Sequence, residues 1–203
     1  MVIYGTEQVS PEVIKINSSA GLAFFIRISY LNEVSPEEIV LNAEFEGQKE
    51  QDIIDAGMCY AAEMKAVEYL ARAEQCRFKL TQKLLQKNYE KQYVSRALDY
   101  LERKNYLNDA RFAEFWLNGR KINHSEGHTK LLAELMSRGI SKDVAQKALE
   151  NFFKNNSEAD LCRRDYEKCL RTKKDPDKIV RTLISHGFQY SLIKKIMREE
   201  AED

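Results

Sequence analysis

The sequence predicts a mainly α-helical protein made of elongated tandem three-helix repeats, with a small β-hairpin-like segment at the N-terminus. Three observations predict this fold. The 203 residues include only three prolines and eight glycines, and so few helix-breaking residues favour long helices joined by short turns. Apolar residues recur at helical spacing from Met58 to the end of the chain. One helical pattern also occurs three times, at shifts of 51 and then 48 residues.

The first 57 residues are expected to form an N-terminal extension. Two segments rich in apolar residues, 12–17 and 22–30, flank a turn-like stretch that ends at Gly21, which predicts a hairpin. An isolated hairpin is only marginally stable in water, so this one must add a strand or pack on helices. Ser35 and Pro36, followed by two glutamates, predict the start of a short helix, because serine caps helices and proline and carboxylates suit the first turn.

Each repeat begins with a helix of the same design. Leu80 starts the pattern in the first copy, Leu131 in the second and Ile179 in the third. Apolar residues stand at i, i+4 and i+5, a basic residue closes the helix, and Asn or Gly follows before a large apolar residue. His186 takes the closing basic position in the third copy. Cations suit the last turn of a helix, and Asn or Gly can adopt the left-handed conformation that ends one.

Two more helices complete the repeat. A third helix is expected at 108–120 and at 157–171, and 58–72 resembles the third helix of a truncated leading unit. Because one such unit buries its apolar face poorly, neighbouring units are expected to stack into a curved array. The second helices share apolar stripes at i, i+4 and i+5, formed by Tyr93, Ala97 and Leu98, by Val144, Ala148 and Leu149, and by Leu192, Ile196 and Met197.

These patterns divide the chain into four segments. An N-terminal extension covers 1–57, the first repeat unit 58–122, the second 123–173, and a truncated third unit with an acidic tail 174–203. Nothing resembles a signal peptide or a membrane span, so we expect a cytoplasmic protein. Its four cysteines match no CxxC pattern, and in a reducing compartment we expect them to be free thiols on helices.

Charge is strongly segregated along the chain, although the formal net charge is zero. Residues 1–71 hold four basic and twelve acidic side chains, whereas 72–198 hold 28 basic and 16 acidic ones, and the last five residues carry four negative charges. A basic body of this kind suits a polyanion or an acidic groove of a protein partner. The acidic ends would face basic partners or compete with nucleic acid for the body.

The basic residues form three groups, which we predict to bind a macromolecular partner. Spacings of three or four residues place several of them on one helix face. Any one such run can equally be a solvated helix face, but three of them on a small basic body favour a polyanion-binding surface. The groups are Arg72, Arg77, Lys79, Lys83 and Lys87; Arg120 and Lys121; and Arg163, Arg164, Lys168, Arg171, Lys173 and Lys174.

The sequence favours a binding protein over an enzyme. It has no phosphate-cradling glycine loop and no serine or cysteine beside a histidine in a nucleophile motif. His124 and His128 have a spacing that metal ligands on a helix can have, but the residues between them predict a helix break, so we expect a solvated loop. We therefore predict no catalytic residues, no metal and no cofactor. Phe112, Phe115 and Trp116 are expected to be core residues and not a base-stacking face.

One eight-residue segment resembles a known signature. Residues 106–113 read Tyr-Leu-Asn-Asp-Ala-Arg-Phe-Ala, similar to the Tyr-Leu-Asp-Asp-x-Arg-Phe-Ala signature of the bacterial RecX family. Further similarity at 69–84 and 127–140 extends the resemblance over roughly residues 66–200, and 1–57 match poorly. The chain departs from the family pattern at Asn88 and Asn105, where glycine is usual, and at Cys76, where a serine cap is usual.

The signature itself is interpreted as mainly structural. An asparagine in place of the usual aspartate still caps the third helix, the next residue favours the positive end of its dipole, and the apolar members fix the turn against the preceding helix. The arginine is placed to pair with a carboxylate of a neighbouring unit. The residues are Tyr106, Leu107, Asn108, Asp109, Arg111 and Phe112.

The resemblance implies a function in DNA repair and homologous recombination. The RecX family regulates RecA, the filament-forming recombinase, so the resemblance implies a protein that binds in the groove of the RecA–DNA filament. There it would inhibit or modulate recombination, ATPase and coprotease activities. The expected partners are RecA and DNA, single- or double-stranded and bound without sequence preference, and the expected state is a monomer. Two alternatives stay open: an autonomous DNA-binding protein similar to helix-turn-helix modules, and a passive adaptor whose acidic N-terminal segment recruits another partner.

Overall fold

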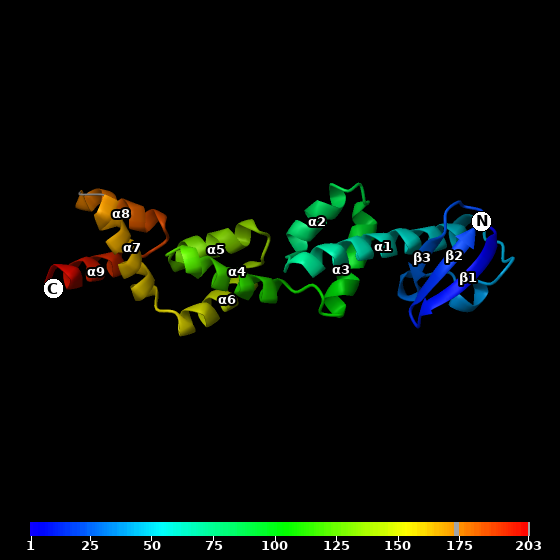
Figure 1. The fold of residues 1–203 in the computed structure, drawn as a ribbon, viewed down its shortest axis with the longest axis horizontal. Coiled ribbons are helices and arrows are strands. Elements are labelled where there is room, and N and C mark those ends of the chain that lie inside the picture. Colours follow the sequence, from blue (N-terminus) through cyan, green and yellow to red (C-terminus); the bar gives the residue numbers. More distant parts are fainter. Residues whose placement is uncertain (173–174, 203) are drawn as a thin grey trace. The chain divides into compact units, whose positions relative to one another are not determined.

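The computed structural model describes residues 1–172 and 175–202, with side chains up to residue 200. The chain divides into two compact units, an N-terminal unit, Met1–Leu107, and a C-terminal unit, Asn108–Asp203. Figure 1 shows a small sheet and three helices in the first unit and only helices in the second. The mainly helical fold with a small N-terminal β-segment is therefore confirmed.

The β-segment is a three-stranded antiparallel sheet and not a two-stranded hairpin. β1 (Ile3–Ser10) pairs with β2 (Val13–Ser18), which pairs with β3 (Phe24–Arg27), in the order β1-β2-β3. β1 was not predicted, because most of its residues are exposed and those at its centre, residues 6–8, are polar. The second predicted strand is also shorter than expected, since a 3-10 turn, η1 (Ile28–Tyr30), follows β3 at once.

A long helix, α1 (Gly47–Arg72), carries the sheet. It begins well before Met58, so the predicted boundary at residue 57 falls inside a helix. A stripe of small residues faces the core, and Gly57 lets β3 approach closely, because a Cβ there would lie 2.8 Å from the ring of Phe24. The helix predicted after Ser35 is a single 3-10 turn, η2 (Pro36–Glu38), with the expected capping box.

The predicted helix pairs of the three repeats are all present. The N-terminal unit contains α2 (Arg77–Leu85) and α3 (Lys91–Arg103), and the C-terminal unit contains the other two pairs and the third helices. The third helices are α4 (Asp109–Asn123) and α7 (Glu158–Thr172). The remaining pairs are α5 (His128–Ser137) with α6 (Lys142–Asn155), and α8 (Pro176–Ser185) with α9 (Tyr190–Glu202).

A left-handed residue ends the first helix of every pair. Asn88, Gly139 and Gly187 have φ values of 64°, 83° and 91°. In each case the amide of the following residue donates to a carbonyl five residues back, at 3.2–3.3 Å, as from Tyr89 to Leu84. Asn105 closes α3 in the same way, with φ 58°. Asparagine therefore does replace glycine as the left-handed cap at both departures from the family pattern.

The apolar stripe of the first helices is only partly buried. Its i and i+4 positions are core residues, and Leu84, Leu135 and Leu183 are fully buried. Its i+5 positions are exposed in all three copies, by 40% at Leu85, 46% at Met136 and 48% at Ile184. In a helix with 3.6 residues per turn, position i+5 lies about 140° away from position i, so this apolar residue lies outside the face that packs on the core.

Two glycines join the helices of the C-terminal unit. The amide of Gly127, before α5, donates to the carbonyl of His186 at the end of α8, over 2.9 Å. A Cβ on Gly127 would lie 2.4 Å from the carbonyl oxygen of Gly187, and a Cβ on Gly187 would lie 2.4 Å from the amide nitrogen of Lys130. Only glycine allows this approach of the backbones, which holds the last helix pair against the second repeat.

The burial of the i+4 leucine predicts how the first helices respond to truncation. Replacing Leu84 or Leu135 by Ala should lower the free energy of unfolding by about 2–5 kcal/mol, because each change leaves a cavity in a packed core. Replacing the adjacent exposed Leu85 or Met136 by Ala should cost less than about 1 kcal/mol. Urea denaturation followed by circular dichroism measures both, and equal costs within a pair would contradict this packing.

Candidate functional site

The predicted basic group of the N-terminal unit lies mostly on α2. Lys79 is exposed on that helix, Lys87 is exposed in the turn that follows it, and Arg72 is exposed at the end of α1. Lys83 is half-buried: its Nζ lies 2.8 Å from Oε1 of Gln75 and 5.1 Å from the ring centre of Tyr69. Lys79 and Lys87 therefore present their charge to solvent, whereas Lys83 also packs against α1.

Arg77 belongs to the fold of the same unit. Its guanidinium binds Asp99 at 2.7 Å and also pairs with Glu102, both on α3. Two carboxylates raise its pKa although partial burial lowers it. The ion pairs connect the start of α2 to α3. They also neutralise the charge of Arg77, which was predicted to contact a polyanion.

The basic group of α7 is split in a similar way. Arg164, Lys168 and Arg171 are exposed, and Arg164 also donates to Oγ of Ser125 at 2.8 Å. Arg163 instead binds Glu199 at 2.8 Å and Glu200 at 3.1 Å, both on α9. The acidic end of the chain thus competes for one basic residue of the body, as its charge pattern suggested.

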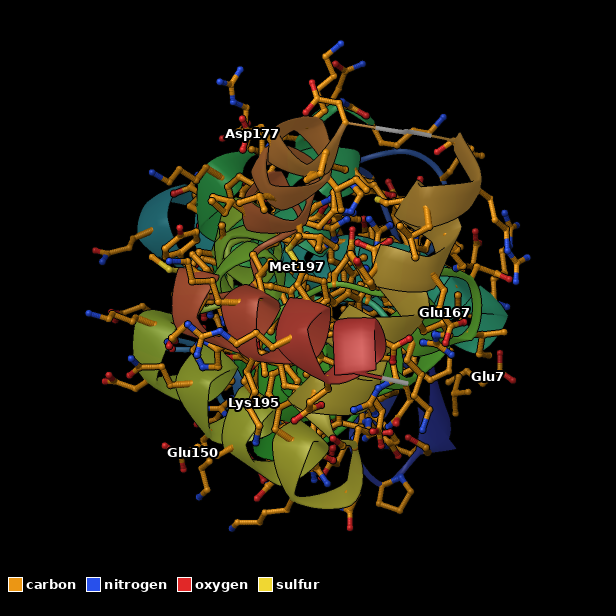
Figure 2. The ribbon with its side chains drawn as sticks, turned by 90° about the vertical axis from the view of Figure 1, so that its left-hand side faces the viewer. Glu7, Glu150, Glu167, Asp177, Lys195 and Met197 are labelled. Atoms are coloured by element: carbon orange, nitrogen blue, oxygen red, sulfur yellow. The ribbon has the colours of Figure 1, made fainter. Side chains whose placement is uncertain are left out.

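Two features limit the positive charge around α7. Glu167, which precedes Lys168, also points into solvent (Figure 2). Lys173 and Lys174, the last members of the predicted group, lie outside the described residues. The exposed positive charge of α7 in the described part of the chain therefore comes from three side chains.

The third predicted group, Arg120 and Lys121, is largely part of the fold. Arg120 donates to both carboxylate oxygens of Glu126, at 2.7 and 2.9 Å, and Glu126 also pairs with Lys130 at 2.8 Å. Lys121 lies 3.2 Å from Oδ1 of Asn156. Burial by itself raises the pKa of Glu126, but the hydrogen bonds from Arg120 and Lys130 outweigh it and lower that pKa to about 2.

The loop between His124 and His128 differs from expectation. It does break the helix, but Ser125, Glu126 and Gly127 are buried, so it is not a solvated loop. The burial of this loop was not predictable, because Arg120 and Glu126 are six residues apart and lie on either side of a helix end, so no helical spacing connects them. Within the described part of the chain, no group of three or more histidine, cysteine or acidic side chains is arranged to hold a metal ion.

His186 does more than close a helix. Its Nδ1 lies 2.7 Å from Oδ2 of Asp165, a side chain of α7 that is only 6% exposed. The pair links the end of α8 to α7. His186 therefore takes the basic position at the end of α8, as the repeat pattern predicts, and also contacts α7.

The aromatic residues of α4 are not a single core cluster. Phe112 is buried, as expected, whereas Phe115 is 64% exposed, so its assignment to the core was wrong. Trp116 is half-buried between two cations, 5.7 Å from Arg120 and 4.4 Å from Arg138. Position i+3 from Phe112 lies on the solvent side of α4, which helical spacing alone did not distinguish.

The signature segment has the predicted cap. Oδ1 of Asn108 accepts from the amides of Ala110 and Arg111, each at 3.0 Å, and Leu107 is buried. Tyr106, however, is 62% exposed, so it does not fix the turn by burial. The capping interpretation is confirmed, and the interpretation of the tyrosine is not.

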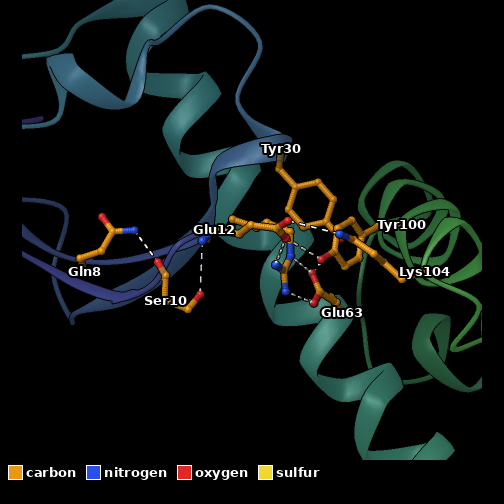
Figure 3. Close-up of polar contacts among 8 residues, drawn as sticks. Gln8, Ser10, Glu12, Tyr30, Glu63, Tyr100 and Lys104 are labelled. Atoms are coloured by element: carbon orange, nitrogen blue, oxygen red, sulfur yellow. Dashed lines mark hydrogen bonds and ion pairs between the residues drawn. The ribbon is translucent and has the colours of Figure 1, made fainter.

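A polar network that the sequence did not reveal anchors the sheet to α1 and α3 (Figure 3). Arg27 of β3 donates to Glu63 of α1 at 2.8 Å and to Glu12 at 2.9 Å, and Tyr30 donates to Glu63 at 2.9 Å. Tyr100 of α3 donates to Glu12 at 2.8 Å, and the Arg27 guanidinium lies 4.2 Å from its ring centre. The residues of this network are far apart in the sequence, so no local sequence pattern predicts their contacts.

The network and its neighbour Asp52 shift several pKa values. Hydrogen bonds from Tyr100 and Lys104 lower the pKa of Glu12, whereas burial and the bond to Glu12 raise that of Tyr100 to about 12. Asp52 of α1 accepts three backbone amides of residues 32–34 at 2.8–3.1 Å, and these outweigh burial and lower its pKa. Asp52 therefore holds the loop at 32–34 on α1, and Glu12 connects β3 to the end of α3.

None of the helices in the described part of the chain is both long and apolar enough to cross a membrane.

All four cysteines are buried thiols, and none forms a disulfide. Cys76 is not helical as expected: it is the residue that precedes α2, and its side chain makes no capping hydrogen bond. Burial raises the pKa of Cys59 and of Cys162 to about 11, so these thiols are poor nucleophiles.

Comparison with known proteins gives consistent results. A family model described as "RecX, second three-helix domain" matches residues 108–149. The regulatory protein RecX of Treponema pallidum is 37% identical over 144 residues, which are 71% of this chain and 88% of that protein. The RecX protein of Clostridium beijerinckii is 24% identical over 196 residues, 91% of this chain and 86% of its own length.

Solved structures agree on the fold. A crystal structure of regulatory protein RecX has a TM-score of 0.77 at 19% identity and covers 97% of this chain and 98% of its own. The crystal structure of RecX from Lactobacillus salivarius has a TM-score of 0.62 at 22% identity and covers 70% of this chain and 96% of its own.

The low pKa of Glu126 predicts a pH dependence of stability. A carboxyl whose folded pKa, about 2, lies below its ordinary 4.5 stabilises the fold above pH 4.5 and loses this contribution as the pH falls toward 2. Replacing Glu126 by Gln should therefore cost at most about 3 kcal/mol at pH 7, and this cost should vanish toward pH 2.

Denaturant unfolding at pH 7, 4 and 2.5 measures the effect. The control is Glu150→Gln, a change of the same chemistry at an exposed site on α6, whose cost should stay near zero throughout. A cost of Glu126→Gln that is the same at all three pH values would contradict the assignment of Glu126 as a carboxylate held by Arg120 and Lys130.

Proposed function

The chain belongs to the RecX family of regulatory proteins, and from this we propose that it regulates the RecA recombinase by binding the filament that RecA forms on DNA. In this role it modulates strand exchange and the linked ATPase and coprotease activities. It acts by binding and carries out no reaction of its own. The filament offers both a protein surface and DNA phosphates to a chain with exposed cations on α2 and α7.

The observation that carries this proposal is the extent of the similarity to a regulatory protein. The 37% identity to the Treponema pallidum RecX protein spans 88% of that protein, so it includes the repeats and not one motif alone. The relatives are named as regulators and not as enzymes. This supports a regulatory role that rests on binding.

Exposed cations support contact with nucleic acid. Lys79 lies on α2 and Lys87 in the turn that follows it, and Lys168 and Arg171 lie one turn apart on α7. Exposed cations of this kind can replace the counterions of DNA phosphates, which makes binding sensitive to salt and indifferent to sequence. The proposal therefore assigns DNA contact to these exposed residues and not to Arg77, Arg120 or Arg163, whose carboxylate partners lie in the same unit.

An autonomous DNA-binding protein is the second candidate, favoured by the match to a three-helix domain. Helix-turn-helix modules also consist of short helices in such units, and they read base edges in the major groove. Binding to one duplex sequence at physiological salt, with RecA absent, would favour this candidate. Binding without sequence preference that weakens steeply with salt fits filament regulation better.

The passive-adaptor alternative is better tested by point substitutions than by removal of the N-terminal segment. Deleting residues 1–57 would remove the sheet and the first eleven residues of α1, Gly47–Arg72, and so damage the core of the N-terminal unit. Reversal of exposed charges keeps the fold intact, so point substitutions separate an adaptor from a filament regulator more cleanly than this deletion.

The first functional prediction concerns RecA itself. Adding this protein at less than one molecule per RecA should lower DNA-dependent ATP hydrolysis, because a filament modulator acts on an assembly of many subunits. A coupled ATPase assay on preformed RecA–single-stranded DNA filaments measures this. An unchanged rate at saturating protein would overturn the proposal.

The second functional prediction concerns the exposed lysines of α2 and of the turn after it. The double variant Lys79→Glu, Lys87→Glu should bind RecA–DNA filaments at least tenfold more weakly while its circular dichroism stays that of the wild type, since both side chains are exposed. The double variant Lys142→Glu, Lys147→Glu makes the same change in net charge on exposed positions of α6 and serves as control. Equal weakening in both variants would show that net charge matters and not these two positions.

A further inference from the structure

A groove of about 240 Å³ lies between α4 and α6 in the C-terminal unit. Leu117 of α4 and Phe152 of α6, both buried, form its apolar floor. Its walls are unusually rich in carboxamide side chains and carry one acidic and one basic residue. The polar lining consists of Asn118, Asn151, Asn155, Asn156, Glu114 and Lys121.

Three of the asparagines are oriented by their own helices. The Nδ2 of Asn118 donates to the carbonyl of Glu114 at 3.0 Å, that of Asn155 to the carbonyl of Asn151 at 3.3 Å, and that of Asn156 to a carbonyl four residues back at 2.7 Å. Each bond uses one N–H of the amide. The second N–H of Asn118 and of Asn155, and their Oδ1 atoms, are left for another partner.

A carboxamide with one N–H and one oxygen available matches the backbone of an extended peptide. The amide oxygen accepts from a main-chain N–H, and the amide N–H donates to a main-chain carbonyl. Asn151 and Asn155 are four residues apart on α6, so they stand about 6 Å apart along the helix. Peptide groups that face the same way in an extended chain repeat about every 6.6 Å, a closely similar spacing.

The charges of the groove favour a peptide over nucleic acid. Glu114 and Lys121 lie one on each side of Asn118 along α4, and together they give the groove no net charge. Phosphates would meet a carboxylate and only one cation, whereas nucleic-acid grooves are strongly positive. A polypeptide needs no such excess, and an acidic side chain on it would pair with Lys121.

We propose that the groove between α4 and α6 binds an extended segment of a partner protein through its main chain, with Asn118, Asn151 and Asn155 as the residues that pair with the peptide groups. The buried Phe152 and Leu117 form the floor on which a side chain of the segment packs. The proposal deepens the function given above, on which it rests only in the choice of RecA as the source of peptides. It assigns to this groove a contact with protein, separate from the cations that contact DNA.

The experiment uses the full chain and an array of overlapping 12-residue peptides that together cover RecA. Peptides that bind are labelled with fluorescein and titrated by fluorescence anisotropy against the wild type and the triple variant Asn118→Ala, Asn151→Ala, Asn155→Ala. All three side chains are exposed and alanine favours helices, so this variant should fold with at least wild-type stability. The control is Gln82→Ala, which removes an exposed amide from α2 in the other unit.

The proposal expects at least one RecA peptide to bind the wild type and Gln82→Ala equally, and the triple variant at least tenfold more weakly, with binding of fluorescein-labelled oligo(dT) unchanged. It is overturned if no peptide binds the wild type, if the triple variant binds the peptide as the wild type does, or if only oligo(dT) binding falls. Inhibition of the RecA ATPase by the wild type, with no peptide bound, would refute this proposal alone. Peptide binding without any effect on the ATPase would refute the proposed function and leave the groove's assignment standing.

Discussion

The whole structure depends on one backbone device, the left-handed residue that ends the first helix of each repeat. At Asn88, Gly139 and Gly187 the chain turns so that the next amide bonds five residues back, and the second helix starts within a few residues. This turn sets the angle at which the helix pair buries its i+4 leucine. Because the same bond recurs three times at nearly the same length, the helix pairs are built alike although their sequences share few residues. The close contact between Gly127 and Gly187 adds a second such constraint, which joins the last pair to the one before it.

The cations of the chain serve two purposes that only the structure separates. Arg27, Arg77, Arg120 and Arg163 each pair with carboxylates within their own unit, and the hydrogen bonds from Arg120 and Lys130 outweigh burial and lower the pKa of Glu126. An ion pair that is partly buried costs much to break, since it leaves a charge without a partner. These arginines therefore hold helices together. The exposed lysines of α2, of the turn after it and of α7 do not hold helices together in this way and stay available to a polyanion.

Much of the fold could be predicted from the sequence because it rests on local signals. Helix spacing, caps and left-handed closers act within five residues, so the three helix pairs and the cap at Asn108 were predictable. Strand β1 and the start of α1 were not, since both are rich in polar residues and their burial depends on tertiary contacts. The same holds for the candidate site. Spacing identifies which lysines share a helix face, but it cannot reveal that Arg163 pairs with α9 or that the asparagines of α4 and α6 line one groove.

We propose above all that the exposed lysines of α2, of the turn after it and of α7 face the nucleoprotein filament. Acetylation footprinting of the full chain, with and without RecA–DNA filaments, tests it most directly, because mass spectrometry reports the reactivity of each lysine. We expect the reactivity of Lys79, Lys87 and Lys168 to fall at least threefold on filament binding and that of Lys142 and Lys147 on α6 to stay unchanged. Full reactivity of all five lysines in the bound state would contradict it.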